Sequence, residues 1–307
     1  MGDTPELREV AAGLRFPEGP IAMDDGSVVL VEIARGTLSR VWPDGKVEVV
    51  ADLGGGPNGA AIGPDGKVYV CNNGGCFRWE DRFGYTVPGS PPPDEWSGGS
   101  IQRVDLETGE VELVYTESSS GPLRAPNDLV FDGAGGFWFT DHGVRLARSS
   151  DRTGVHYARP DGSSCQEILF PLDAPNGIGL SPDESVLYVA ETHTSRVWAW
   201  DLAGPGELGP IDPLRPEPGG RLLVGLSGLQ LLDSLAVDSE GWVCVGTLVN
   251  GGITAVCPQG RMVEHTSLPD PLVTNVCFAG DDPVTAYATL SATGRLVAFD
   301  WRPHNRY

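Results

Sequence analysis

A six-fold internal repeat restricts the fold of this chain more than any other feature. Each copy has an apolar strand of about five residues, a tight turn rich in Gly, Pro, Asn and Asp, and a second apolar strand. Long helical periodicity is almost absent, so the pattern is that of an all-β protein. The copies begin with PEGPIAMDDG at Pro17, PNGAAIGPDG at Pro57, PNDLVFDGAG at Pro126, PNGIGLSPDE at Pro175, LDSLAVDSEG at Leu232 and TNVCFAGDDP at Thr274.

The spacing of the copies, 40 to 69 residues, predicts one four-stranded sheet per copy. Such sheets are stacked radially in a propeller, whereas a solenoid would repeat more strictly and with parallel strands. We therefore expect a single six-bladed β-propeller domain over residues 1–307. The last copy supplies only the three strands TNVCFA, TAYATL and LVAFDW. The early segment LREVAAGL is predicted to add the missing outer strand and close the ring, which removes an exposed sheet edge.

The second residue of every copy carries an oxygen in its side chain. In a propeller the innermost strands surround the central channel, so these side chains should converge at one end of it. Asn and Asp also favour turns, but a turn role would scatter the residue types and would not keep two carboxylates. A ring of carboxylate and amide oxygens suits a hard divalent cation such as Ca²⁺, Mg²⁺ or Mn²⁺, and a purely structural ring is the alternative. The six residues are Glu18, Asn58, Asn127, Asn176, Asp233 and Asn275.

These ordered segments, FPEGP with Glu18 and PNG with Asn176 above all, resemble the regucalcin / gluconolactonase / luciferin-regenerating-enzyme family. The resemblance extends roughly from Leu7 to Trp301. It implies a six-bladed propeller with one divalent metal in the channel, Ca²⁺ first and Mg²⁺, Mn²⁺ or Zn²⁺ as alternatives, and hydrolysis of a lactone. At the fourth ligand the family often has PDG, whereas this chain has LDS. The implied metal ligands are Glu18, Asn127, Asn176 and Asp233.

A metal with an open coordination position can polarise a lactone carbonyl as a Lewis acid. Asp233 is the expected general base, because a carboxylate at that position can face both metal and substrate, although it can also serve as a ligand only. Two other functions remain open. The first is a metal-dependent organophosphate hydrolase, because the calcium-dependent organophosphate hydrolases are propellers with similar metal ligands. The second is a calcium-binding propeller that catalyses no reaction. The chain has no GxSxG, P-loop or HExxH motif.

Substrate contacts are expected on the face where the inner strands begin. The loops after each second strand return to this face and bring Asn72, Asn73, Asp141, Glu191 and residues 248–250 to the mouth. Asn58 and Asn275 belong to the ring without being implied ligands, so they are expected to support it or to contact substrate. The other expected substrate contacts in this part of the chain are Asp128, His142 and His193.

Residues 77–99 form a long insertion after the second strand of the second copy. Its aromatic content argues against disorder, and loops of this length inside a compact domain are usually functional. We expect a lid over the channel, with an oligomer contact as the alternative, and substrate contacts from Trp79, Tyr85 and Trp96. The Pro/Gly-rich insertion at 202–220 is expected to be a surface excursion.

The charge of the chain limits its partners. Against 42 acidic residues it has 21 basic ones, for a net charge of −21, and no basic patch is dense enough to follow a phosphate backbone. Nucleic acid and membrane surfaces are therefore not expected as partners. No apolar stretch approaches the roughly 18 residues of a membrane helix, and MGDTPELREV lacks the apolar core of a secretory signal. We expect a cytoplasmic monomer or weak homo-oligomer that acts on a small molecule.

Overall fold

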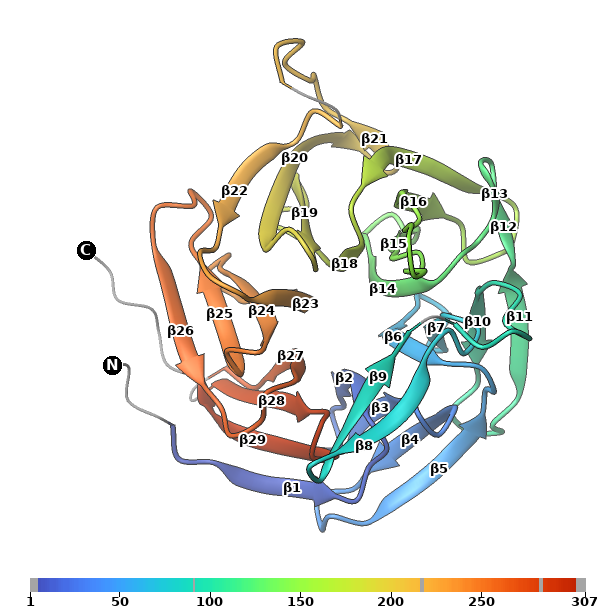
Figure 1. Ribbon diagram of the computed structural model, residues 1–307, viewed down its shortest axis with the longest axis vertical. Coiled ribbons are helices and arrows are strands. Elements are labelled where there is room, and N and C mark those ends of the chain that lie inside the picture. Colours follow the sequence, from blue (N-terminus) through green and yellow to red (C-terminus); the bar gives the residue numbers. More distant parts are fainter. Residues whose placement is uncertain (1–4, 91, 216–217, 282–283, 302–307) are drawn as a thin grey trace.

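Six antiparallel sheets are arranged radially around a central channel in the computed structural model of the chain (Figure 1). The structure describes residues 5–90, 92–215, 218–281 and 284–301, and the ends of the predicted 1–307 domain lie outside these ranges. The described residues form strands, and none of them belongs to a helix long and apolar enough to cross a membrane. The prediction of an all-β, six-bladed propeller is confirmed.

Each blade is named by its strands from the channel outward. The first blade contains β2 (Pro17–Ala22), β3 (Val28–Glu32), β4 (Thr37–Val41) and β5 (Val47–Asp52). The second contains β6 (Pro57–Ile62), β7 (Val68–Asn72), β10 (Ser100–Val104) and β11 (Val111–Tyr115). The third contains β14 (Pro126–Phe131), β15 (Phe137–Asp141), β16 (Thr153–Ala158) and β17 (Cys165–Leu172).

The remaining blades follow the same order. The fourth contains β18 (Pro175–Leu180), β19 (Val186–Glu191), β20 (Arg196–Gly204) and β22 (Arg221–Gly225). The fifth contains β23 (Leu231–Val237), β24 (Val243–Leu248), β25 (Gly252–Val256) and β26 (Val263–Ser267). The sixth contains β27 (Val273–Ala279), β28 (Val284–Leu290), β29 (Arg295–Trp301) and, as its outermost strand, β1 (Arg8–Ala12).

The N-terminal strand closes the ring as predicted. β1 pairs antiparallel with β29, with Arg8 opposite Ala298 and Ala12 opposite Arg295. The sixth sheet thus combines the start of the described chain with its end, which ties the two ends of the propeller together and covers the outer edge of β29.

Two insertions extend the blades. Between β7 and β10 the chain forms a hairpin of β8 (Arg78–Arg82) and β9 (Tyr85–Gly89). The amide of Thr86 in this hairpin donates a 2.9 Å hydrogen bond to the carbonyl of Ala292, and Trp79 packs on Phe16 with ring centroids 4.9 Å apart. The hairpin of the second blade therefore contacts the first and sixth blades. The short strands β12 (Glu117–Ser118) and β13 (Gly121–Pro122) pair before β14, and β21 (Glu207–Leu208) pairs with the end of β20.

Burial explains why the strands differ in composition. The second strand of a blade lies between two strands of its own sheet and faces a neighbouring sheet on each side, so β3, with the sequence VVLVE, is buried throughout. The outer strand β5, with the sequence VEVVAD, is largely exposed or half-buried. The core lies between adjacent sheets, where Val29 and Val31 pack with Val68 and Val70. Each such fully buried side chain stabilises the fold by about 1.5–3 kcal/mol.

A β-bulge in every inner strand orients the ring residues. In the first five blades the bulge contains or begins at the second residue of the repeat. A bulge adds one residue to one strand and re-aims a side chain, here toward the channel. The glycine of PNG has a separate role. A Cβ on Gly59 would lie 2.5 Å from the carbonyl oxygen of Asn127, and one on Gly177 would lie 2.5 Å from the amide nitrogen of Leu235. Glycine is therefore required where neighbouring inner strands approach.

Candidate functional site

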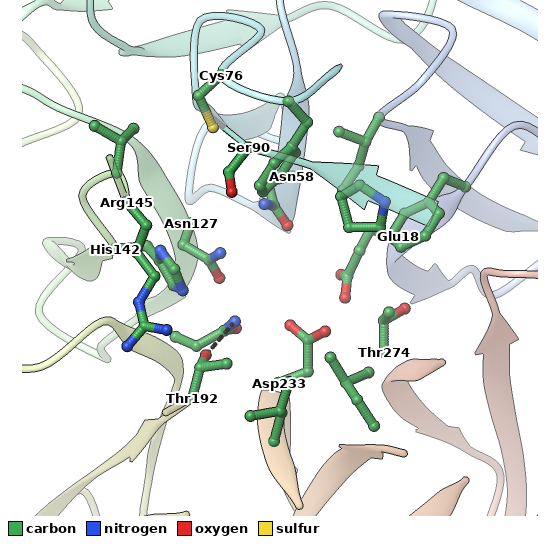
Figure 2. Close-up of a pocket in the computed structure, with 18 of the residues that line it drawn as sticks. Glu18, Asn58, Cys76, Ser90, Asn127, His142, Arg145, Thr192, Asp233 and Thr274 are labelled. Carbon is green, nitrogen blue, oxygen red and sulfur yellow. Dashed lines mark hydrogen bonds between the residues drawn. The ribbon is translucent and has the colours of Figure 1, made fainter. Parts of the chain in front are cut away.

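The channel opens into a cavity of about 280 Å³ at the end where the inner strands begin. Five of the six predicted ring residues line this cavity, each from a different blade. Figure 2 shows the carboxylates of Glu18 and Asp233 and the amides of Asn58 and Asn127 turned toward one another. We call the five residues the channel ring: Glu18, Asn58, Asn127, Asn176 and Asp233.

The sixth blade departs from the predicted ring. Its bulge lies between Val273 and Asn275, so Thr274 is the residue inside the bulge and the one that lines the cavity. Asn275 does not line it. The Asn275 Nδ2 atom donates a 2.8 Å hydrogen bond to Glu18 Oε2, and its Oδ1 atom accepts a 2.7 Å bond from the amide of Val276. The sequence left two roles open for Asn275, support of the ring and contact with the substrate. Its hydrogen bond to Glu18 fits support of the ring.

Three oxygens of the channel ring have no hydrogen-bond partner among the described residues, although they are buried. They are Glu18 Oε1, Asn58 Oδ1 and Asn127 Oδ1. The Nδ2 atom of Asn176 donates a 3.1 Å bond to Thr192 Oγ1, and its Oδ1 atom has only a long, 3.5 Å contact from Ser234 Oγ. A buried polar atom without a partner costs about 1–3 kcal/mol. Several such oxygens facing one point form an arrangement that a divalent cation satisfies.

Electrostatics in the channel support the same conclusion. Burial raises the pKa of Glu18 to about 7. Desolvation, followed by repulsion from Glu18, holds the pKa of Asp233 well above its usual range. A bound cation would remove both causes, because it replaces the lost hydration and separates the like charges. The described residues contain no cluster of three or more His, Cys, Asp or Glu side chains suited to a metal. The channel ring instead offers the oxygens of two carboxylates and three amides. A set of oxygen donors alone fits Ca²⁺, Mg²⁺ or Mn²⁺ better than Zn²⁺.

Asp128 lies behind the ring and does not line the cavity. Its Oδ1 atom accepts a 3.0 Å bond from the amide of Leu129, and its Oδ2 atom accepts a 3.3 Å bond from the amide of Ile178. This carboxylate connects the inner strands of the third and fourth blades. Burial, together with the nearby Glu18 carboxylate, raises its pKa well above the ordinary range.

Two histidines predicted at the mouth line the cavity. The rings of His142 and His193 meet edge to face with centroids 5.7 Å apart. The Nδ1–H group of His142 donates to the carbonyl of Gly143 at 3.1 Å, which leaves Nε2 as an acceptor in the neutral ring. Burial lowers the pKa of His142 and lowers that of His193 to about 4, so both rings are neutral at pH 7.

Leu248 of the predicted 248–250 loop also lines the cavity, whereas four other residues predicted at the mouth hold the loops instead. Asp141 accepts hydrogen bonds from the amides of Arg124 and Ala125 at 2.7 Å and of Gly143 at 3.0 Å. The loops reach the mouth as predicted, but the side chains of Asp141, Asn72, Asn73 and Glu191 do not line the cavity. We call the residues that end the second strand in the first four blades the clamp residues, because each accepts from the backbone that leads into its inner strand: Glu32, Asn72, Asp141 and Glu191.

The 77–99 insertion contributes one side of the cavity through residues other than the predicted substrate contacts. Phe77, Pro88, Gly89, Ser90 and Pro92 line the cavity. The three predicted aromatic contacts do not. Trp79 packs on Phe16, Tyr85 is exposed on β9, and the Nε1 atom of Trp96 donates a 2.9 Å bond to the carbonyl of Asn73.

The rest of the lining is largely apolar, with one cation. Phe16, Ile33, Val144, Leu231 and Leu272 are among the apolar residues. Arg145 is the only Lys or Arg among the described residues that line the cavity. Phe16 directly precedes the first repeat, so its place at the cavity could have been predicted from the sequence. Arg145 lies in the connection between β15 and β16, outside the segments that recur from copy to copy, and has no comparable signal.

Comparisons with known proteins agree with this geometry. Residues 16–292 match the model of the SMP-30/Gluconolactonase/LRE-like region. A gluconolactonase from Zymomonas mobilis is 27% identical over 309 residues, covering 93% of this chain and 79% of that protein. The structure of a gluconolactonase from Xanthomonas campestris superposes with a TM-score of 0.74 at 22% identity, over 97% of this chain and 95% of the other.

A second solved structure shares the fold. Regucalcin from Agrobacterium tumefaciens, described as a calcium-binding protein, superposes with a TM-score of 0.70 at 17% identity, over 93% of this chain and 90% of that one. At these identities the structural matches show the shared propeller, whereas the match to the family model covers most of the chain. The chain therefore belongs to the SMP-30/gluconolactonase/LRE-like family.

Proposed function

We propose that this protein is a divalent-metal-dependent hydrolase of a lactone, either a sugar lactone or a related cyclic ester. Membership of the family and the activities named for its gluconolactonase relatives support the reaction class. The observation that carries the proposal is the set of buried, unpartnered oxygens in the channel ring, since it provides a place for a cation at the base of a cavity large enough for a small molecule.

Glu18, Asn127, Asn176 and Asp233 would hold the metal, with Ca²⁺ as the first candidate. The calcium-binding description of the regucalcin structure supports this choice. When bound, the cation supplies a Lewis acid that polarises the lactone carbonyl and stabilises the oxyanion formed from it. The unpartnered oxygen of Asn58 faces the same space and is available to the metal or to the substrate.

The two carboxylates of the ring have different surroundings, which assigns them different roles. Glu18 is almost fully buried, and its Oε2 atom is committed to Asn275 and to the amide of Gly19. Asp233 is half-buried at the cavity wall. We therefore assign the general base to Asp233, which takes the proton of the attacking water, and a holding role to Glu18.

The cavity wall positions the substrate. The apolar side chains and the 77–99 insertion exclude water from the carbonyl, and we propose that the insertion acts as a lid. His142 and His193 are neutral hydrogen-bonding groups that face substrate hydroxyls. The cytoplasmic location and the monomeric or weakly oligomeric state expected from the sequence remain predictions.

A pH-drop assay on a panel of lactones tests this function, with chelator treatment, metal add-back and a phosphotriester as a second substrate class. We expect lactone turnover that chelation abolishes and Ca²⁺ restores. Turnover that ignores the chelator contradicts the metal mechanism. Cleavage of the phosphotriester without any lactone identifies an organophosphate hydrolase, and Ca²⁺ binding without turnover identifies a binding propeller.

The Asp233→Asn variant tests the general base separately. We expect turnover to fall by about 10²–10⁴-fold, the usual contribution of a positioned acid or base. Calorimetric titration of Ca²⁺ into the same variant measures whether it still binds the metal. A variant that binds the metal and retains most of its turnover shows that Asp233 is a ligand only.

A further inference from the structure

Arg145 places a single positive charge on one wall of the cavity. It lies between β15 and β16, and its side chain lines the cavity together with His142 and Val144. Figure 2 shows Arg145 beside His142, on the opposite side of the cavity from Glu18 and Thr274. The two carboxylates of the channel ring and the guanidinium therefore face the same space from different sides.

The segment that carries Arg145 is held by its own hydrogen bonds. The amide of Asp151 donates to the carbonyl of Val144 at 3.0 Å, and Arg145 forms a β-bridge with Ser150. Val144 is buried in a small cluster with Cys76 and Ala125. Because Arg145 directly follows this buried anchor, its backbone is fixed next to the cavity while its side chain remains exposed.

The carboxylate on the segment that carries Arg145 is engaged elsewhere. Asp151 accepts from the Nε atom of Arg124 at 3.0 Å and from the amide of Val144 at 3.2 Å. Asp173 is close enough to affect both histidine rings, yet among the described residues no carboxylate forms an ion pair with Arg145. The neighbouring imidazoles are neutral at pH 7, so Arg145 is the only fixed positive charge among the described residues that line the cavity. A guanidinium without an ion-pair partner among the described residues favours a small anion at this wall, against the net negative charge of the chain.

We propose that the cavity takes a lactone bearing a carboxylate substituent, with the lactone carbonyl at the channel ring and the carboxylate on Arg145. This inference rests on the proposed function and specifies its substrate class. The planar guanidinium matches one carboxylate in a two-point contact, which favours a carboxylate over a phosphate dianion at a site with one cation. The carbon frame between the two ends would lie along the apolar wall formed by residues such as Val144 and Leu231.

A matched pair of substrates tests the proposal on the calcium-loaded full chain. The 1,4-lactone of a hexaric acid carries a carboxylate where the 1,4-lactone of the corresponding hexonic acid carries a hydroxymethyl group. We expect Arg145→Gln to lower kcat/KM on the acidic lactone by about tenfold or more, since hydrogen bonds to charged groups are the strong ones. On the neutral lactone we expect a change within about twofold. Arg148→Gln removes the same charge from the same segment outside the cavity lining and should leave both substrates unaffected.

Three results would overturn the proposal while leaving lactone hydrolysis intact: no preference of the wild type for the acidic lactone, an equal loss on both lactones in Arg145→Gln, or an equal loss in Arg148→Gln. If neither lactone is hydrolysed, calorimetric titration of the acidic lactone decides the question independently of turnover. Binding that is lost in Arg145→Gln and retained in Arg148→Gln supports the anion site, and absence of binding to the wild type rejects it. Preference of the wild type for a phosphorylated lactone over the carboxylate-bearing lactone would also reject the assignment of Arg145 to a carboxylate.

Discussion

The channel ring and the clamp residues are two sets of polar side chains, buried except for the half-buried Asp233, that are built by the same repeat and differ in their hydrogen bonds. Asn58 and Asn72 show this within one blade. The Oδ1 atom of Asn72 accepts from two backbone amides at 2.9 Å, whereas the Oδ1 atom of Asn58 has no partner among the described residues. A satisfied buried oxygen stabilises the fold, and an unsatisfied one costs stability unless a ligand supplies the partner. We therefore propose that the clamp residues maintain the fold and that the channel ring serves the function.

The largest effect should come from the same substitution made once in each set, within the first blade. Glu18→Gln removes a channel carboxylate, and we expect kcat/KM on a lactone to fall by about 10³-fold, equivalent to about 4 kcal/mol. Glu32→Gln keeps an acceptor for the amide of Arg15 and should stay within about fivefold of the wild type. Steady-state kinetics with saturating Ca²⁺ measures both. Equal losses of kcat/KM in the two variants would contradict the functional distinction between the channel ring and the clamp residues.

A somewhat smaller effect should appear in stability, with the order reversed. Asn72→Ala removes four hydrogen bonds, to the amides of Gly56 and Gly74, the carbonyl of Gly54 and the side chain of Gln102. We expect it to lower the free energy of unfolding by about 2–4 kcal/mol.

Asn58→Ala is the matched control in the same blade. Because it removes an unpartnered oxygen, we expect a change within about 1 kcal/mol in the chelated protein. Urea denaturation with chelator present compares the two variants. An Asn58→Ala variant as unstable as Asn72→Ala would show that the channel ring also maintains the fold.

The pH dependence of the chelated protein sharpens the comparison further. Because burial raises the pKa of Glu18 from 4.5 to about 7, the folded state favours the protonated carboxyl. Its contribution to stability is fully present below pH 4.5 and is lost as the pH rises through about 7. The loss should be on the order of 3 kcal/mol, and Asp233 acts in the same direction.

Urea denaturation at pH 5 and pH 8, with and without Ca²⁺, measures this dependence. We expect Ca²⁺ to abolish most of the loss, since it stabilises the ionised carboxylates. Glu18→Gln should reduce the loss in the chelated protein, because it removes one of the titrating groups. Chelated wild type that is equally stable at both pH values would contradict the assigned burial of the ring carboxylates.

The smallest effect concerns the hairpin of β8 and β9, whose Pro88 and Gly89 line one side of the cavity. Trp79 packs on Phe16, which lines the cavity, whereas Phe83 at the hairpin turn is fully exposed. We expect Trp79→Ala to raise KM by about fivefold, roughly the 1 kcal/mol of an aromatic pair, and Phe83→Ala to leave KM unchanged. Kinetics on one lactone decides this. An unchanged KM in Trp79→Ala would show that the hairpin does not contribute to substrate binding.

Much of the fold could be predicted because each repeat carries its own strand and turn signals. The apolar runs VVLVEI and VYVCNN correspond to β3 and β7, and LREVAAGL contains the strand that closes the ring. The channel ring could be predicted because equivalent positions in the blades of a propeller face the same channel. Five of six ring residues follow this rule.

The remaining differences arise from information that residue types do not carry. In the sixth blade Val273, not Thr274, pairs with the last residue of the second strand, so the copy begins one residue earlier than predicted. Thr274 therefore lines the cavity and Asn275 binds Glu18. The oxygen-bearing side chain of Asn275 made the later start look correct in the sequence. Asp141 and Asn72 have the residue types of a binding site, yet their oxygens are used by nearby backbone amides. Arg145 lies in a connection with no counterpart in the other repeats, so no comparison between blades could reveal it.

Calorimetric titration of Ca²⁺ into the chelated protein tests the central claim most directly. We predict one site per chain, with affinity reduced by about 100-fold or more in Glu18→Gln and unchanged in the clamp variants Glu32→Gln and Asn72→Ala. Absence of binding to the wild type, or binding that Glu18→Gln leaves intact, would contradict the assignment of the channel ring as a cation site.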